Sequence, residues 1–154
     1  MSGMSSIKTI LLEQETCCKA LVVLLQRERA SLVDFDARAV EELTKEKDTL
    51  LLRMRLLDEE RQRLVSSLSS ERQWQDEGEL TLRVLAEKTG DSELSDIRLK
   101  LFSLAQSIND LNNFNKYLID RSLSGVRSAK GFFDAFGDWA PEPTVNGTLL
   151  SRET

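Results

Sequence analysis

The side chains that most often carry covalent or metal chemistry are scarce in this chain of 154 residues. It contains no histidine, and its two cysteines, Cys17 and Cys18, are adjacent. Neighbouring residues of a helix point about 100° apart, so a disulfide between them would be strained. Without histidine, Ser-His-Asp and Cys-His nucleophilic sites and most zinc sites are excluded. We interpret one thiol as an apolar core side chain and the other as incidental.

Paired carboxylates are the remaining route to catalysis. The acidic residues, however, alternate with Lys and Arg at surface-like helix positions, as in Glu41 with Lys45 and Glu59 with Arg63. Such pairs four residues apart stabilise a solvated helix face. The sequence also contains no Gly-rich phosphate loop and no Cys/His metal pattern. It therefore predicts a protein that is not an enzyme and needs no cofactor or metal.

A binding function is better supported, and its candidate residues lie between 112 and 136. Large apolar side chains there alternate with Ser and Gly residues such as Gly125 and Gly131, and each Gly costs a helix roughly 1 kcal/mol relative to Ala. The candidate partner-binding residues are Asn112, Phe114, Asn115, Leu118, Ile119, Val126, Phe132, Phe133 and Phe136. A weak helix with a broad apolar face is typical of a segment that is completed by a partner.

Two other interpretations of this segment stay open. It could pack on the first helix of the same chain, with the small residues permitting close approach. It could also lie on a membrane surface, although it carries only Arg121, Arg127 and Lys130 as basic residues. Asn115 falls on the apolar stripe itself, where one polar residue can set register or partner choice.

The elements that position these residues are predicted to be helices. Apolar residues recur at spacings of three and four from Leu94 to Phe136, which indicates one long helix that packs on others. Similar stripes predict helices over about 6–32 and from 37 to the low seventies, and a short helix over 79–88. The predicted N-caps are Asp36 and Ser92, and the predicted stops are Gly90 and Gly137.

The predicted fold is all-α. It is an elongated antiparallel helical hairpin or bundle of three long helices and one short helix, with coiled-coil-like packing. Lys47 and Arg61 occupy stripe positions of the second helix, where they reach the edge of the stripe or fix its alignment. We predict a helical domain over 1–137, with a docking extension over about 112–137, and a flexible tail over 138–154.

Charge and hydropathy narrow the classes of partner. The formal net charge is −5 and basic residues are mixed with acidic ones, so nucleic-acid binding is not expected. No apolar run approaches the roughly 18–20 residues that span a bilayer, and the N-terminus lacks the pattern of a signal peptide. These features favour a cytoplasmic protein without stable membrane insertion.

Three segments, in this order, resemble the FlgN family of flagellar export chaperones. They are Leu-Leu-Glu-Gln-Glu at 11–15, Val-Glu-Glu-Leu-Thr-Lys-Glu-Lys at 40–47 and Leu-Asn-Asn-Phe-Asn-Lys-Tyr-Leu-Ile at 111–119. The resemblance implies a cytosolic, non-enzymatic chaperone of the flagellar type III secretion system. Its clients would be the hook-associated proteins of the hook–filament junction, bound through their terminal helices. It would prevent their premature assembly and deliver them to the export apparatus, with the C-terminal helix as the client-binding region.

One departure concerns the tail. Members of the family often end with a Tyr followed shortly by a Gly, whereas this chain has Val145 before Gly147. A contact with export-gate components through that tyrosine is therefore in doubt. The alternative to a chaperone is a structural coiled-coil protein whose apolar C-terminal helix forms a homodimer.

Overall fold

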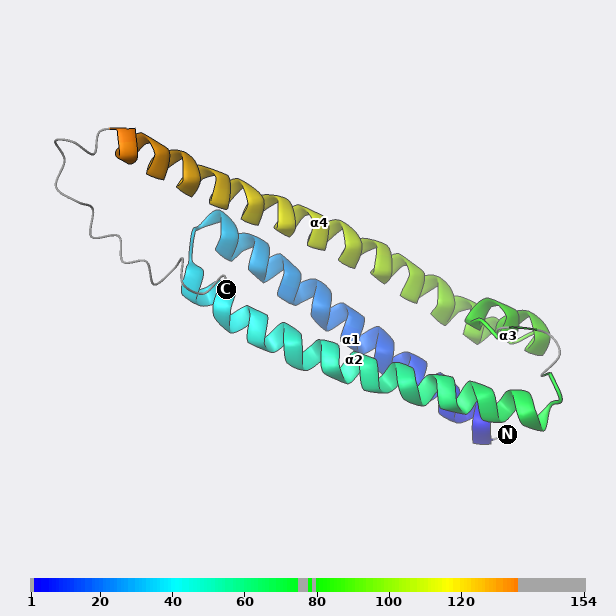
Figure 1. The fold of residues 1–154 in the computed structure, drawn as a ribbon. Helices are drawn as coiled ribbons and strands as arrows, with labels where there is room; N and C mark the ends of the chain where they lie inside the picture. Colours follow the sequence, from blue (N-terminus) through cyan, green and yellow to red (C-terminus); the bar gives the residue numbers. More distant parts are fainter. Residues whose placement is uncertain (1, 75–77, 79, 136–154) are drawn as a thin grey trace. The chain divides into compact units, whose positions relative to one another are not determined.

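Four helices make up most of the chain in the computed structural model, which describes residues 2–74, 78 and 80–135 (Figure 1). They are α1 (Ser2–Val33), α2 (Ala37–Glu71), α3 (Leu82–Thr89) and α4 (Ser92–Ala135). No strand occurs among the described residues, so the predicted all-α fold is confirmed.

The chain divides into two compact units, Met1–Leu118 and Ile119–Thr154, and the helical segment α4 spans the division. The predicted domain limits stay a prediction. The predicted stop at Gly137 and the predicted tail lie outside the described residues.

A tight turn joins α1 to α2 and makes them an antiparallel hairpin within the first unit (Figure 1). Phe35 adopts a positive φ of 56° in this turn. The Asp36 side chain then accepts a hydrogen bond from the backbone N–H of Ala39 at 3.1 Å. This bond satisfies one of the free donors at the start of α2 and confirms the predicted cap.

The short helix α3 begins later than predicted. The hydroxyl of Thr81 accepts from the backbone N–H of Val84 at 3.2 Å, which places the start of the helix at Leu82. Gly90 ends the helix with φ of 62°, a left-handed conformation that glycine adopts without a Cβ penalty. The predicted stop at Gly90 is confirmed.

The predicted N-cap of the last helix was wrong by one residue. Asp91, not Ser92, places a carboxylate oxygen 3.0 Å from the backbone nitrogen of Glu93 and 3.4 Å from that of Leu94. A carboxylate at this position accepts the free N–H groups and also interacts favourably with the helix dipole. Ser92 is consequently the first residue of α4.

The main apolar core lies where the first turns of α1 and α4 meet α3 and the end of α2. Its buried members are Ile7, Leu11, Leu68, Leu85, Ala86, Leu94 and Ile97. Trp74, just after α2, is half-buried against this core. Its ring lies under the cations of Arg72 and Lys88, at 5.7 and 5.3 Å from the ring centroid.

Candidate functional site

A buried polar network joins three helices within the first unit. The Glu28 side chain of α1 is paired on one oxygen with Lys47 Nζ of α2, at 2.6 Å. Its other oxygen accepts from Asn115 Nδ2 of α4 at 2.9 Å. The same Asn115 nitrogen donates to the backbone carbonyl of Leu25 at 3.0 Å. One glutamate therefore fixes the alignment of both α2 and α4 on α1.

The orientation of the Asn115 amide follows from its partners. Both neighbouring groups are acceptors, so the nitrogen must face them and the oxygen must point away. That oxygen is buried and has no hydrogen-bond partner among the described residues. The network is thus nearly, but not fully, satisfied, which makes it costly to disturb.

Asn115 needs a correction as a partner-binding candidate. Its exposed fraction is 2%, and both hydrogen bonds of its nitrogen stay within the chain. The polar residue on the stripe therefore aligns helices of the same molecule. Lys47 does the same from α2, whereas Arg61 pairs with Asp58 within α2.

Several other candidates in the first unit are accessible. Phe114 is 46% exposed. Its ring stacks on that of Tyr117, which was not among the candidates and is 55% exposed, with centroids 6.3 Å apart. Asn112 is exposed and Leu118 is half-buried. The stacked pair is an apolar surface that a partner can cover.

The second unit continues α4 with exposed apolar side chains. Ile119 and Val126 are 40% and 62% exposed, and Leu123, which the sequence analysis omitted, is 38% exposed. Its spacing of four from Ile119 and three from Val126 was the signal that could have identified it. Phe132 and Phe133 belong to α4, but their side chains are not among the described groups, and Phe136 lies outside the described residues.

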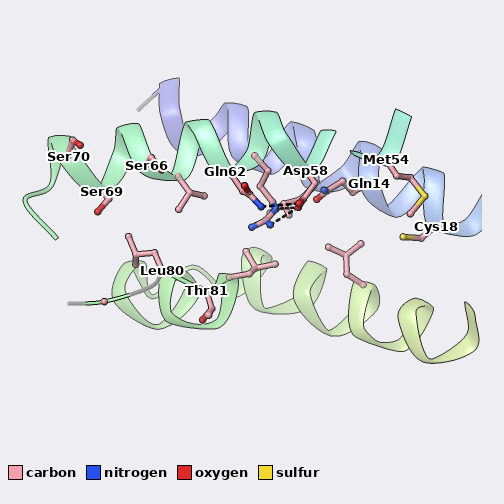
Figure 2. A pocket seen from close by; sticks show the side chains of 16 residues that line it. Gln14, Cys18, Met54, Asp58, Gln62, Ser66, Ser69, Ser70, Leu80 and Thr81 are labelled. Carbon is pink, nitrogen blue, oxygen red and sulfur yellow. Dashed lines mark hydrogen bonds and ion pairs between the residues drawn. The ribbon is translucent and has the colours of Figure 1, made fainter. Parts of the chain in front are cut away.

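A groove that sequence reasoning missed lies within the first unit (Figure 2). It encloses about 1060 Å³. Leu11, Gln14 and Cys18 contribute from α1, and Leu101 contributes from α4. The largest share of the lining comes from α2, between Met54 and Ser70, and Gly78, Leu80, Thr81 and Leu82 complete it. Burial raises the pKa of the Cys18 thiol, with smaller contributions from Cys17 and Glu15, so this thiol is protonated near neutral pH.

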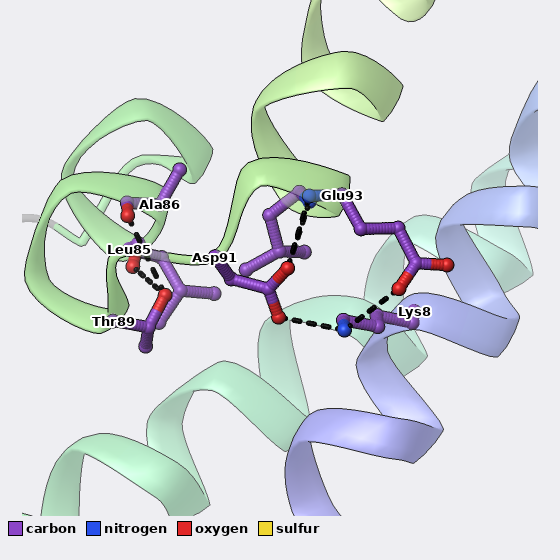
Figure 3. Close-up of polar contacts among 7 residues, drawn as sticks. Lys8, Leu85, Ala86, Thr89, Asp91 and Glu93 are labelled. Carbon is purple, nitrogen blue, oxygen red and sulfur yellow. Dashed lines mark hydrogen bonds and ion pairs between the residues drawn. The ribbon is translucent and has the colours of Figure 1, made fainter.

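A polar cluster ties the start of α1 to the start of α4 (Figure 3). Lys8 Nζ lies 2.6 Å from Asp91 Oδ2 and 2.9 Å from Glu93 Oε2. The hydrogen bond from Lys8 lowers the pKa of the Asp91 carboxyl below its ordinary value of 3.8. The same carboxylates raise the pKa of Lys8. The ion pair between Lys8 and Asp91 is therefore sensitive to acid, because protonation of the carboxylate removes it.

Asp91→Asn is expected to make the protein less sensitive to acid. A carboxyl whose folded-state pKa is lowered stabilises the fold above its unfolded pKa, and that contribution is lost as pH falls through the folded pKa. Asn keeps the N-cap but removes the charge. Urea unfolding between pH 3 and pH 7 should show a smaller loss of stability below about pH 4 in the variant. Asp96→Asn, at an exposed site of the same helix, should keep the acid dependence of the parent chain, and an equal effect of both changes would contradict the assignment.

Among the described residues, no helix is both long enough and apolar enough to cross a membrane. No group of three or more potential metal ligands was found in the same part of the chain.

Comparison with known proteins gives one match. The family model described as FlgN protein matches residues 1–133, which include the first unit and most of the second unit's part of α4. No curated protein matches, and no solved structure does so either.

Proposed function

We propose that this chain, which belongs to the FlgN family of flagellar export chaperones, binds hook–filament junction proteins in the cytoplasm before their export. Chaperones of this family bind flagellar export substrates. The proposal adds the client class, the prevention of premature assembly and the delivery of the client to export-gate components. We propose the delivery step from family membership alone. Val145, which stands where family members often have a tyrosine, lies outside the described residues.

The observation that supports client binding is the exposure of large apolar side chains of α4 from Phe114 onward. A step of about 100° per residue places them in two groups on different sides of the helix, Phe114 with Tyr117 and Ile119 with Leu123 and Val126. Phe114, Tyr117, Ile119, Leu123 and Val126 are each between 38% and 62% exposed. Covering one large apolar side chain contributes about 1.5–3 kcal/mol before the cost of ordering a partner. A few such contacts, less that cost, correspond to a reversible complex of about micromolar affinity, which suits a client that must be released. Phe132, Phe133 and Phe136 extend the proposed surface along the sequence.

The double substitution Ile119→Asp and Val126→Asp should weaken client binding at least tenfold. It places two charges where an amphipathic client helix would bury apolar groups, and a tenfold loss corresponds to about 1.4 kcal/mol. Isothermal titration with a purified hook–filament junction protein measures the affinity. Both parent residues are exposed, so far-UV circular dichroism should change little.

Ser124→Asp is the control, because it adds one such charge at an exposed site between the two positions in the sequence. It should bind the client as the parent chain does. Unchanged affinity of the double variant would refute the proposed surface. If instead the free parent chain sediments as a dimer that only the double variant dissociates, the surface serves self-association.

A further inference from the structure

The outward side of α4 in the first unit is almost free of charge. Between Lys100 and Lys116 the helix carries one charged residue, Asp110, although 31% of the whole chain is charged. Leu99 and Phe102 are each 59% exposed, which places large apolar groups on this side. Depletion of charge together with exposed aromatic side chains distinguishes protein interfaces from ordinary solvated surface.

A step of about 100° per residue aligns several exposed side chains of this region in one stripe, which we call the outer stripe. Its members are Leu99, Phe102, Gln106, Asn109, Asn113 and Tyr117. They recur at spacings of three and four, which is the pattern by which one helix packs along another. Leu94 and Ile97, which belong to the core, lie on the other side of the helix.

The middle of the outer stripe consists of amides, which are complementary to themselves. Gln106, Asn109 and Asn113 each carry donors and an acceptor in one group. An amide can therefore exchange hydrogen bonds with the same amide of another molecule, whereas a carboxylate or an ammonium group repels its own kind. The same stripe on a second copy of the chain is consequently a chemically suitable partner.

The charged residues that flank the stripe match each other when two copies of α4 run antiparallel. Let the two-fold axis pass just before Asn109. Asp96 of one copy then lies opposite Arg121 of the other, and α4 is one helix over this whole range. At about 100° per residue, these two residues lie within about 20° of each other around the helix axis, on the same edge of the stripe. Arg98 lies within one residue of the position opposite Asp120, and two-fold symmetry forms each charge pair twice.

The same arrangement also brings uncharged groups together. Leu99 and Tyr117 point in the same direction around the helix, and each lies within one residue of the position opposite the other. Asp110 lies in the same way beside Gln106, whose amide can donate to the carboxylate. Asp110 also approaches its own symmetry mate, and this contact between like charges weakens the association.

We propose that the outer stripe is a dimer interface, through which α4 packs antiparallel on α4 of a second copy of this chain. A contact about 38 Å long, from Asp96 to Arg121, and one helix wide buries roughly 800–900 Å² in total. Interfaces of this size form weak, reversible complexes, so we expect a dissociation constant of about 10–100 µM. The proposal does not rest on the proposed function, because it needs no client.

Charge reversal tests the proposal in the full-length chain. Sedimentation equilibrium between about 5 and 300 µM should show the mass of the parent chain rising from monomer toward dimer. Asp96→Arg places a like charge opposite Arg121 of the other copy and should raise the dissociation constant at least tenfold. The exchange Asp96→Arg/Arg121→Asp restores opposite charges and should return the constant to within about threefold of the parent value.

Three further variants serve as controls. Asp48→Arg makes the same change at an exposed site of α2 and should leave the association unchanged. Ile119→Asp/Val126→Asp should also leave it unchanged, because these residues lie on another side of α4 than the outer stripe. Asp110→Asn removes the contact between like charges and should tighten the dimer, a gain that a misfolded variant cannot produce.

The outcomes distinguish a second copy from other occupants. A parent chain that stays monomeric at about 300 µM would overturn the proposal. So would a dimer that Asp96→Arg leaves intact, or one that the exchange does not restore. If the chain is monomeric and Asp96→Arg weakens binding of the hook–filament junction protein, the client covers the stripe and the assignment to a second copy is wrong. The outer stripe shares only Tyr117 with the side chains that support client binding, so failure of the dimer leaves the surface at Ile119 and Val126 standing.

Discussion

Glu28→Ala is expected to lower the free energy of unfolding by about 2–4 kcal/mol. The substitution removes the acceptor of Asn115 and the ion-pair partner of Lys47 together. Asn115 then keeps only the Leu25 carbonyl as a partner inside a buried site. The expected loss is below that of a fully buried pair because the Lys47 side chain is 20% exposed and can turn to water. Urea unfolding near neutral pH measures the change.

Glu13→Ala is the matched control for this prediction. Glu13 also joins α1 to α2 through an arginine, but its side chain is 47% exposed and lies 3.7 Å from that of Arg53. Exposed pairs of this kind contribute about 0–1 kcal/mol. If the two substitutions had equal effects, the network around Glu28 would carry no more stability than a surface ion pair.

Local sequence rules were sufficient to predict the four helices and the exact position of two of their ends. Asp36 and Gly90 act through groups on their own or adjacent turns, so residue type alone identified them. The same rules predicted Ser92 as the N-cap of α4, whereas the structure has Asp91 there. Both residue types cap helices, and backbone geometry decides which of two neighbours does so. Helix boundaries are therefore predictable to about a turn, but the identity of the capping residue is not always predictable.

Burial along α4 shows what periodicity cannot provide. Leu94 and Ile97 are buried, but Leu104, Ile108 and Leu111 of the same stripe are only half-buried. A spacing of three and four identifies the face that packs, but not how closely the neighbouring helix approaches. Depth of burial depends on contacts between helices that are distant in sequence.

The candidate site illustrates the same limit. Lys47 and Asn115 were both recognised as polar residues on apolar stripes, but their common partner, Glu28, lies on a third helix. The groove was missed because it depends on the space between α2, α1 and α4 and not on any one motif. Ile119 and Val126, which are exposed, were chosen because they lie beside a stripe whose composition becomes poor in core residues, and their binding role stays a prediction.

Asn115→Asp should destabilise the protein by about 3–5 kcal/mol at pH 7, despite its nearly identical shape. The carboxylate would replace the nitrogen that now donates to Glu28 and to the Leu25 carbonyl. Two hydrogen bonds become contacts between acceptors, and a second negative charge enters a site that is 2% exposed. Urea unfolding at several pH values reports both the size and the electrostatic origin of the effect.

The pH dependence has a definite sign in this variant. Burial and the neighbouring Glu28 charge raise the folded-state pKa of the introduced carboxyl. The penalty is therefore absent below about pH 4, grows above it and is complete once the pH exceeds the raised value. Asn112→Asp and Asn113→Asp add the same charge at exposed positions of the same helix, and each should change stability by less than about 0.5 kcal/mol. A penalty for Asn115→Asp that stayed constant from pH 3 to pH 7 would mean that packing, and not charge, makes this position selective for asparagine.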